Sequence, residues 1–210
     1  MNTPANKPEQ PTALSRALCA MALLCGGLAG CAGLPGAVRP QGGDLTLAGR
    51  AQADGPRSAI LFHFDHAYCV CEGRQNATFV LIQGEEANPV AAATLRILWR
   101  PEAGSTPIDE NASNATLQVI RFGGDATEIY SGAGFVFLGD KPDAAMVSAE
   151  CWSADVALRD TSGKAPDTLG PAHASGGFTA EQNPAKVAEL LLLLSRKASA
   201  GLGYPRLVRK

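Results

Sequence analysis

Residues 59–71, AILFHFDHAYCVC, form a long β-prone run, and the face that each side chain takes in it decides the predicted fold. Side chains alternate along a strand, so an unbroken strand has two different faces here. One face is apolar and is expected to point into the core: Phe62, Phe64, His66, Tyr68 and Val70. The other face is more polar and carries Leu61, His63, Asp65, Ala67, Cys69 and Cys71.

Further β-prone runs follow at short intervals along the chain, at residues 45–51, 77–83, 92–99, 115–122, 129–138 and 146–158. Turn-forming segments such as EGRQN (72–76) separate them. Many short strands with turns between them predict an antiparallel β-sandwich or a barrel-like sheet. The polar segments 101–114 and 160–177 are expected to be loops, and the core is expected to include both tryptophans, Trp99 and Trp152.

The C-terminal segment has the pattern of a helix. Asn183 suits a helix N-cap and Pro184 suits the first turn, so one helix is predicted over about 184–200. Gly201 is expected to end it. Consecutive leucines at 190–194 cover more than one face of this helix, and we expect it to pack across the sheet. The alternative is that part of the helix contacts a partner or lipid.

Composition and charge exclude some classes of function. The chain has 210 residues, which fits one domain with appended segments. Its 18 Lys and Arg nearly balance its 20 Asp and Glu, and no basic run is present, so a nucleic-acid partner is not expected. The sequence contains neither a G-x-S-x-G nor an H-E-x-x-H motif. We therefore expect no bound cofactor and favour a protein that is not an enzyme.

The N-terminal residues indicate export. Lys7 and Arg16 precede the uncharged segment ALCAMALLCGG at 17–27, which is shorter than the roughly 20 residues that span a bilayer. The segment leads into LAGC at 28–31, which resembles the lipobox of bacterial lipoproteins. The resemblance implies that residues 1–30 are a signal peptide and that Cys31 becomes the first mature residue, carrying diacylglycerol and often a further acyl chain. The alternative is an ordinary secretory signal.

The lipoprotein resemblance also predicts a location. Residue 32 is Ala, whereas Asp at this position favours retention in the inner membrane of enterobacteria, so the periplasmic face of the outer membrane is preferred over the inner membrane. Residues 32–43 are rich in Gly and Pro and are expected to be a flexible tether. A single β-rich domain is then expected over 44–210. The membrane, through the lipid, and an envelope protein are the expected partners.

Three cysteines remain in the predicted domain, in an oxidising compartment: Cys69, Cys71 and Cys151. All three are expected on the more polar faces of their strands, so a disulfide between Cys151 and either Cys69 or Cys71 is predicted. Unpaired structural thiols are one alternative. A metal or redox site of the three cysteines, with His173 from the second long loop, is another. His63 lies about 20 Å along a strand from Cys69, too far to share an ion with it.

These observations favour a lipid-anchored envelope protein whose domain is a non-enzymatic binding or assembly module. The tether, the predicted β domain and the absence of catalytic motifs are the grounds for this interpretation. One alternative is a metal-binding or thiol-redox protein that uses Cys69, Cys71 and Cys151. Another is an envelope hydrolase whose site is built from loops such as 160–177.

Overall fold

The structure is a computed structural model, and it describes residues 41–50, 58–101, 112–124, 126–139, 141, 143–163, 167 and 169–208. All of these residues belong to the unit Arg39–Lys210. The predicted signal peptide, Cys31 and the tether up to residue 40 lie outside the described residues. No helix in these ranges is both long and apolar enough to cross a membrane.

The described chain is mainly β with one C-terminal helix, as predicted. The helix α1 spans Pro184–Leu202. The strands are β1 (Gly42–Gly49), β2 (Ala59–Phe64), β3 (His66–Glu72), β4 (Asn76–Glu85), β5 (Asn88–Ile97), β6 (Ala115–Gly123), β7 (Ala126–Leu138), β8 (Met146–Thr161) and β9 (Ala172–Gln182). The segment 160–177 was expected to be a loop, but β8 and β9 take up both of its ends, so that prediction is wrong for much of its length.

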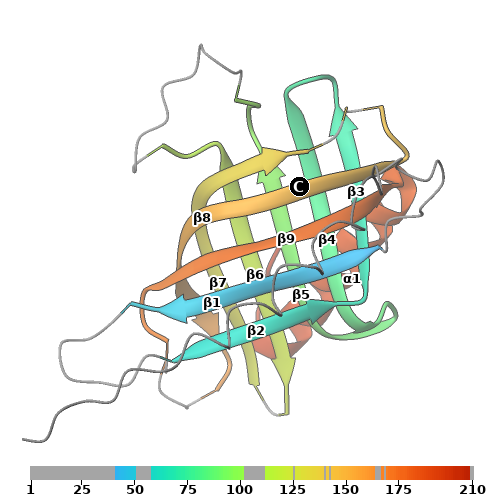
Figure 1. Ribbon diagram of the computed structural model, residues 1–210. Helices are drawn as coiled ribbons and strands as arrows, with labels where there is room; N and C mark the ends of the chain where they lie inside the picture. The colour runs from blue at the N-terminus through green and yellow to red at the C-terminus, as the bar shows by residue number, and fades with distance from the viewer. Residues whose placement is uncertain are drawn as a thin grey trace, which may run out of the picture. The chain divides into compact units, whose positions relative to one another are not determined.

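The sheet closes into a barrel of seven strands, β3 to β9, because β9 pairs with both β8 and β3. The contact between β9 and β3 is parallel and short, and every other pairing is antiparallel. The two remaining strands extend the sheet, since β1 pairs with β9 and β2 pairs with β1. In Figure 1, β8, β9, β1 and β2 cross in front of β3 to β7, and α1 lies behind them.

The opening run is divided at Asp65 into two strands. Before Asp65 the inward residues are Phe62 and Phe64, and after it they are Ala67 and Cys69. The inward positions therefore change from even to odd numbers, which moves every later side chain to the opposite face. Tyr68, expected in the barrel core, packs instead on the side that faces α1. The prediction of one unbroken strand is wrong, although its first half faces the core as expected.

The hydrophobic residues form two clusters, one on each side of the strands β3 to β7. The larger cluster fills the barrel interior, and its biggest fully buried side chains include Phe64, Phe79, Leu81 and Tyr130. The smaller cluster lies between the outside of the barrel and α1, and it includes Val80, Ile82, Ile120, Leu190 and Leu194. The interior of this barrel is thus a packed core, and ligand sites have to be sought on its ends and its outer surface.

The helix begins as the sequence predicts and ends slightly later. The side chain of Asn183 accepts a hydrogen bond from the backbone N–H of Lys186, and Pro184 opens the first turn. The C-cap is Gly203 in the left-handed conformation, and its N–H donates to the carbonyl of Ser199. Gly201 lies inside the helix instead, where an added Cβ would be 1.9 Å from Oγ1 of Thr127.

The leucine run provides a matched test of this packing. Leu194 is fully buried against the barrel, whereas Leu192 in the same run is 61% exposed. We predict that Leu194→Ala lowers the free energy of unfolding by about 2–5 kcal/mol, because it removes buried methyl groups and leaves a cavity. Leu192→Ala should change it by less than about 0.5 kcal/mol. Urea denaturation of both variants measures the difference, and equal effects would contradict the packing described here.

Candidate functional site at one end of the barrel

The three cysteines of the described chain are free thiols that face the barrel interior. Cys69 and Cys151 are fully buried, and Cys71, near the end of β3, is half-buried. The expectation that all three lie on polar faces is wrong for two reasons. The break at Asp65 turns Cys69 and Cys71 inward. In β8, Cys151 points inward and it is the next residue, Trp152, that points out to solvent.

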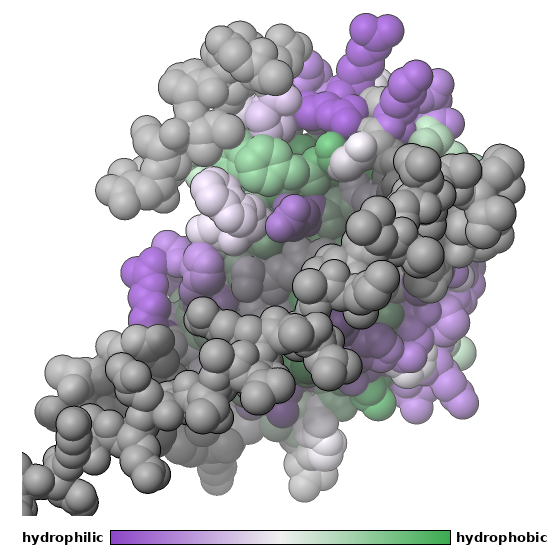
Figure 2. Space-filling model, in the orientation of Figure 1, coloured by the Kyte–Doolittle hydropathy of each residue, from purple (hydrophilic) through white to green (hydrophobic). Residues whose placement is uncertain are grey.

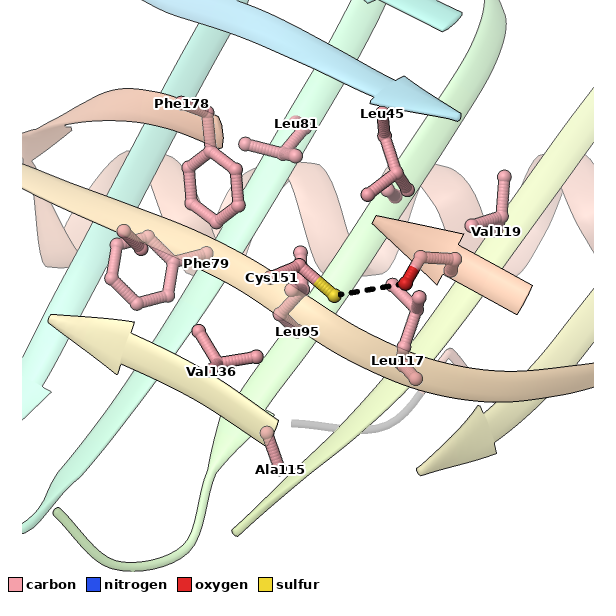
Figure 3. Packing of buried hydrophobic residues seen from close by; sticks show 14 of the residues in the cluster. Leu45, Phe79, Leu81, Leu95, Ala115, Leu117, Val119, Val136, Cys151 and Phe178 are labelled. Carbon is pink, nitrogen blue, oxygen red and sulfur yellow. Dashed lines mark hydrogen bonds between the residues drawn. The ribbon is translucent and has the colours of Figure 1, made fainter. Parts of the chain in front are cut away.

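Cys151 is a structural thiol. Figure 3 shows its side chain among the residues of the larger hydrophobic cluster, and its sulfur donates a hydrogen bond to the carbonyl of Ala174 at 3.7 Å. Burial raises the pKa of Cys151 to about 12. A thiol that is buried and protonated is a poor nucleophile, so we assign Cys151 to packing.

The predicted disulfide is absent from the structure, and the strand register explains why. Cys151 lies beside Gly176 of β9, whereas Cys69 lies beside Gln182 of the same strand. These two positions on β9 are about 20 Å apart along the strand. A disulfide needs Cα atoms within about 7 Å, and Cys71 lies still farther along β3, so Cys151 can reach neither partner.

The same register separates the predicted metal ligands. His173 is paired with Asp155, farther along β9 from Cys69 than Cys151 is. The side chains of Cys69, Cys71, Cys151 and His173 therefore do not converge. Within the described ranges, no group of three His, Cys, Asp or Glu side chains is arranged to hold a metal ion.

The remaining histidines take part in surface contacts. Nδ1 of His63 is 2.6 Å from Oδ1 of Asp44, and that carboxylate raises the pKa of His63 by hydrogen bonding and by its charge. His66 lies 3.8 Å from Glu86, which also forms an ion pair of 2.7 Å with Lys186. This second group of side chains connects the start of α1 to the turn between β4 and β5.

Cys71 differs from the other two thiols because its surroundings favour the thiolate. A hydrogen bond from the thiol of Cys69 lowers the pKa of Cys71 to about 7; partial burial opposes this shift and the charge of Arg100 supports it. In the structure the Cys69 thiol donates a hydrogen bond to the carbonyl of Ala180 at 4.0 Å. A thiolate at Cys71 competes with that carbonyl for the same proton, because a charged acceptor forms the stronger hydrogen bond. The interaction with Cys71, with burial, raises the pKa of Cys69. Cys71 is therefore the reactive member of the pair.

A cavity of about 720 Å³ lies at this end of the barrel. Its lining comes from the turn between β3 and β4, the segment that follows β5, the connection between β7 and β8, and the last residue of β9. The lining residues are Gly73, Arg74, Gln75, Arg100, Lys141, Asp143 and Gln182. Three of these side chains are cationic and one is anionic. An anionic group is therefore the ligand that this cavity favours electrostatically.

Two further contacts shape the cavity, which we call the mouth pocket. The backbone N–H of Arg100 donates to Oε1 of Gln75 at 2.9 Å, which connects the end of β5 to the turn between β3 and β4. The guanidinium of Arg100 donates to the carbonyl of Leu138 at 3.4 Å. Oε1 of Gln182 is buried and accepts no hydrogen bond from the described residues. A ligand that carries a donor beside its anionic group would satisfy that atom.

The sequence predicts the turn at EGRQN (72–76), which carries Arg74, but it does not reveal the mouth pocket. Lys141 lies in a second turn-forming segment, GDKPD (139–143), which is separated from EGRQN by four strands of the sheet. The sequence feature that pointed to the mouth pocket was the presence of a cationic residue in each of several turns. Strand order decides which turns lie at the same end of the barrel, so this feature was not specific before the fold was known.

The cysteine environments generate a prediction about labelling. At about pH 8, iodoacetamide should modify Cys71 much faster than Cys69 or Cys151, because only Cys71 has a lowered pKa and partial exposure. The rate at Cys71 should rise through a midpoint near pH 7. Arg100→Gln should move that midpoint upward, and Arg159→Gln, at an exposed site on β8, should not. Peptide mass mapping measures the rates; equal labelling of Cys71 and Cys151 would contradict the assignment.

No protein-family model, no curated protein and no solved structure matches this chain. The barrel, the free thiols and the mouth pocket are therefore interpreted from their own geometry and charge.

Proposed function

We propose that this chain is a lipid-anchored protein of the bacterial cell envelope whose barrel binds an anionic ligand at the mouth pocket, without catalysing a reaction. The observation that carries the proposal is the set of Arg74, Arg100 and Lys141 around one cavity of about 720 Å³. A cavity of this size is typical of small-molecule sites. Gln182 also lines the cavity, and a donor on the ligand would give its buried side-chain oxygen a hydrogen bond.

The lipid anchor rests on the segment ALCAMALLCGGLAGC at 17–31. Acyl chains contribute roughly 0.8 kcal/mol for each buried CH₂ group, and two chains make attachment stable. Gln41 already contacts the barrel, since its Nε2 donates to the carbonyl of Ala67 at 2.6 Å. The segment 32–40 spans at most about 30 Å when fully extended. A lipid on Cys31 would thus keep the barrel beside the membrane surface, on the periplasmic face of the outer membrane in this proposal.

The anchor is tested by Cys31→Ser in the expressing bacterium. We expect the wild-type protein to sediment with membranes and its N-terminal peptide to carry a diacylglyceryl mass, and we expect the variant to lose both properties. Cys25→Ser is the matched control, because Cys25 lies inside the apolar segment and not at the predicted processing site. Sedimentation of Cys31→Ser with membranes, or an unmodified wild-type peptide, would contradict lipidation.

Ligand binding is tested with inorganic phosphate and sulfate as probes, by calorimetry on the full chain at low salt. The double variant Arg74→Ala, Lys141→Ala should weaken phosphate binding at least about tenfold, or by about 1.4 kcal/mol. Arg159→Ala removes a charge outside the pocket and should leave binding unchanged. Equal losses in the double variant and in Arg159→Ala would indicate general electrostatic attraction and contradict a site.

The two probes also test the role of Gln182. Hydrogen phosphate carries an O–H donor and sulfate carries none, so the wild-type protein should prefer phosphate. Gln182→Met keeps a similar shape without the acceptor, and it should bind both anions with similar affinity. A preference that persists in Gln182→Met would show that the buried oxygen plays no part.

A thiol-dependent activity at Cys71 is the second candidate function, and it is favoured by the partial exposure of this cysteine near the end of β3, where the thiol of Cys69 and the charge of Arg100 lower its pKa. The two candidates differ in what Cys71→Ser does. A binding module keeps its affinity for phosphate in this variant, because the Cys71 thiol is not part of the pocket lining. A thiol-dependent protein loses its cellular phenotype while keeping that affinity.

A further inference from the structure

A second cavity lies on the outer surface of the barrel. It shares no lining residue with the mouth pocket, and its lining carries a different charge. This groove has a volume of about 680 Å³ and extends over β8, β9 and the start of β1. Its lining is Gly42, Ser148, Ala149, Glu150, Cys151, Trp152, Ser175, Gly176, Gly177, Phe178 and Thr179. Glu150 is the one charged side chain in this set. The groove therefore combines an indole, three hydroxyl side chains and a carboxylate.

Trp152 lies on the outer face of β8, as Ser148 and Glu150 do, and β8 carries a bulge directly after this face is set. Toward β7, Cys151 pairs with Val136 and Ser153 pairs with Phe135, so Trp152 is an extra residue between them. Toward β9, the register also shifts between Cys151 and Ala154. Bulges re-aim side chains and are common beside functional sites. The indole, which was expected in the core, is 58% exposed.

Neighbouring aromatic rings support the exposed indole from one side. The ring of Phe137 lies 6.0 Å from that of Trp152, Phe135 lies 4.9 Å from Phe137, and Trp99 lies 5.9 Å from Phe135. Figure 2 shows hydrophobic surface where the end of β7 runs beside β8. This chain of packed rings restricts the orientation of the Trp152 side chain. A ligand that stacks on the indole therefore causes a smaller loss of side-chain conformational entropy.

Gly177 leaves the floor of the groove open, and packing does not require a glycine there. A Cβ added to Gly177 would meet only the carbonyl of Ala149, at an ordinary 3.8 Å, and its φ lies outside the left-handed region. Gly43 and Gly176 differ, since a Cβ at either would lie within 2.3 Å of a backbone oxygen. Glycine weakens a strand interior and often marks a place that a ligand approaches closely. Gly177 fits that second role.

We propose that this groove binds a saccharide, namely a short chain of neutral or N-acetylated pyranose rings. One face of a pyranose ring is lined by C–H groups and stacks on an indole, while its hydroxyl and amide groups form hydrogen bonds around the edge. Glu150 and the hydroxyls of Ser148, Ser175 and Thr179 supply partners for those groups. The carboxylate disfavours the anions that the mouth pocket favours. A purely apolar ligand would take the Glu150 carboxylate out of water without giving it a hydrogen bond.

The experiment uses the full chain with Trp99→Phe, which makes Trp152 the only indole in the protein. The probe is the tetramer of N-acetylglucosamine. Binding should shift the emission of Trp152 to shorter wavelength and protect it from acrylamide quenching, and both changes should saturate. No saturable change up to about 10 mM probe, the range of even a weak site, would overturn the proposal.

Variants of the otherwise wild-type chain then locate the site, with affinity measured by calorimetry. Trp152→Ala should weaken binding at least about tenfold, and Trp152→Phe should restore part of it because an aromatic face returns. Gly177→Leu should abolish binding by filling the floor, without lowering the melting temperature. Ala133→Leu adds the same side chain at an exposed site on β7 and is the control. Normal binding by Gly177→Leu, or equal losses in both leucine variants, would overturn the assignment to this groove.

The proposals of a saccharide site and of an anion site in the mouth pocket can be tested independently of each other. Phosphate binding should be unchanged in Trp152→Ala, and tetrasaccharide binding should be unchanged in the double variant Arg74→Ala, Lys141→Ala, because the two linings share no residue. Loss of both activities in either variant would contradict two independent sites.

Discussion

The barrel depends on the interruption of the β-strand at Asp65, which separates β2 from β3. One edge of β9 is paired with β1 over most of its length and with β3 only at its end. The run 59–71 therefore has to pair first with β1 and then with β9. Asp65 stabilises the change of direction, since its backbone N–H donates to Ile82 and its carboxylate accepts from the N–H of Gly84. Without this break, β3 could not close the ring.

A second irregularity, the bulge at Trp152, has a similar effect on the outer surface. Residues three apart in a regular strand lie on opposite faces, but the bulge allows both Cys151 and Ala154 to point into the core. The indole of Trp152, between them, points outward. Each irregularity changes the face of the residues that follow it. The break at Asp65 moves two thiols to the interior, and the bulge turns Ala154 and Val156 inward after the outward Trp152.

Charge separates the two sites on a chain whose formal net charge is only −2. The mouth pocket gathers three cations from turns that are far apart in sequence, whereas the groove has a single carboxylate. Average composition does not reveal such a division, because residues of opposite sign cancel in the sum. The proposed ligands, an anion at one site and a saccharide at the other, reflect this local contrast.

The sequence by itself determined the fold class and the helix. Repeated β-prone runs with turns between them depend on local chain stiffness, and the Asn183 and Pro184 signals act within one helical turn, so no distant contact was needed to predict them. The same sequence did not determine the faces of Cys69, Cys71 and Trp152, or the grouping of Arg74 with Lys141. The face on which a side chain lies changes when the register shifts by one residue, and strand order decides which turns lie at the same end of the barrel. Both are properties of pairing between segments far apart in the chain, so only the tertiary structure decided them.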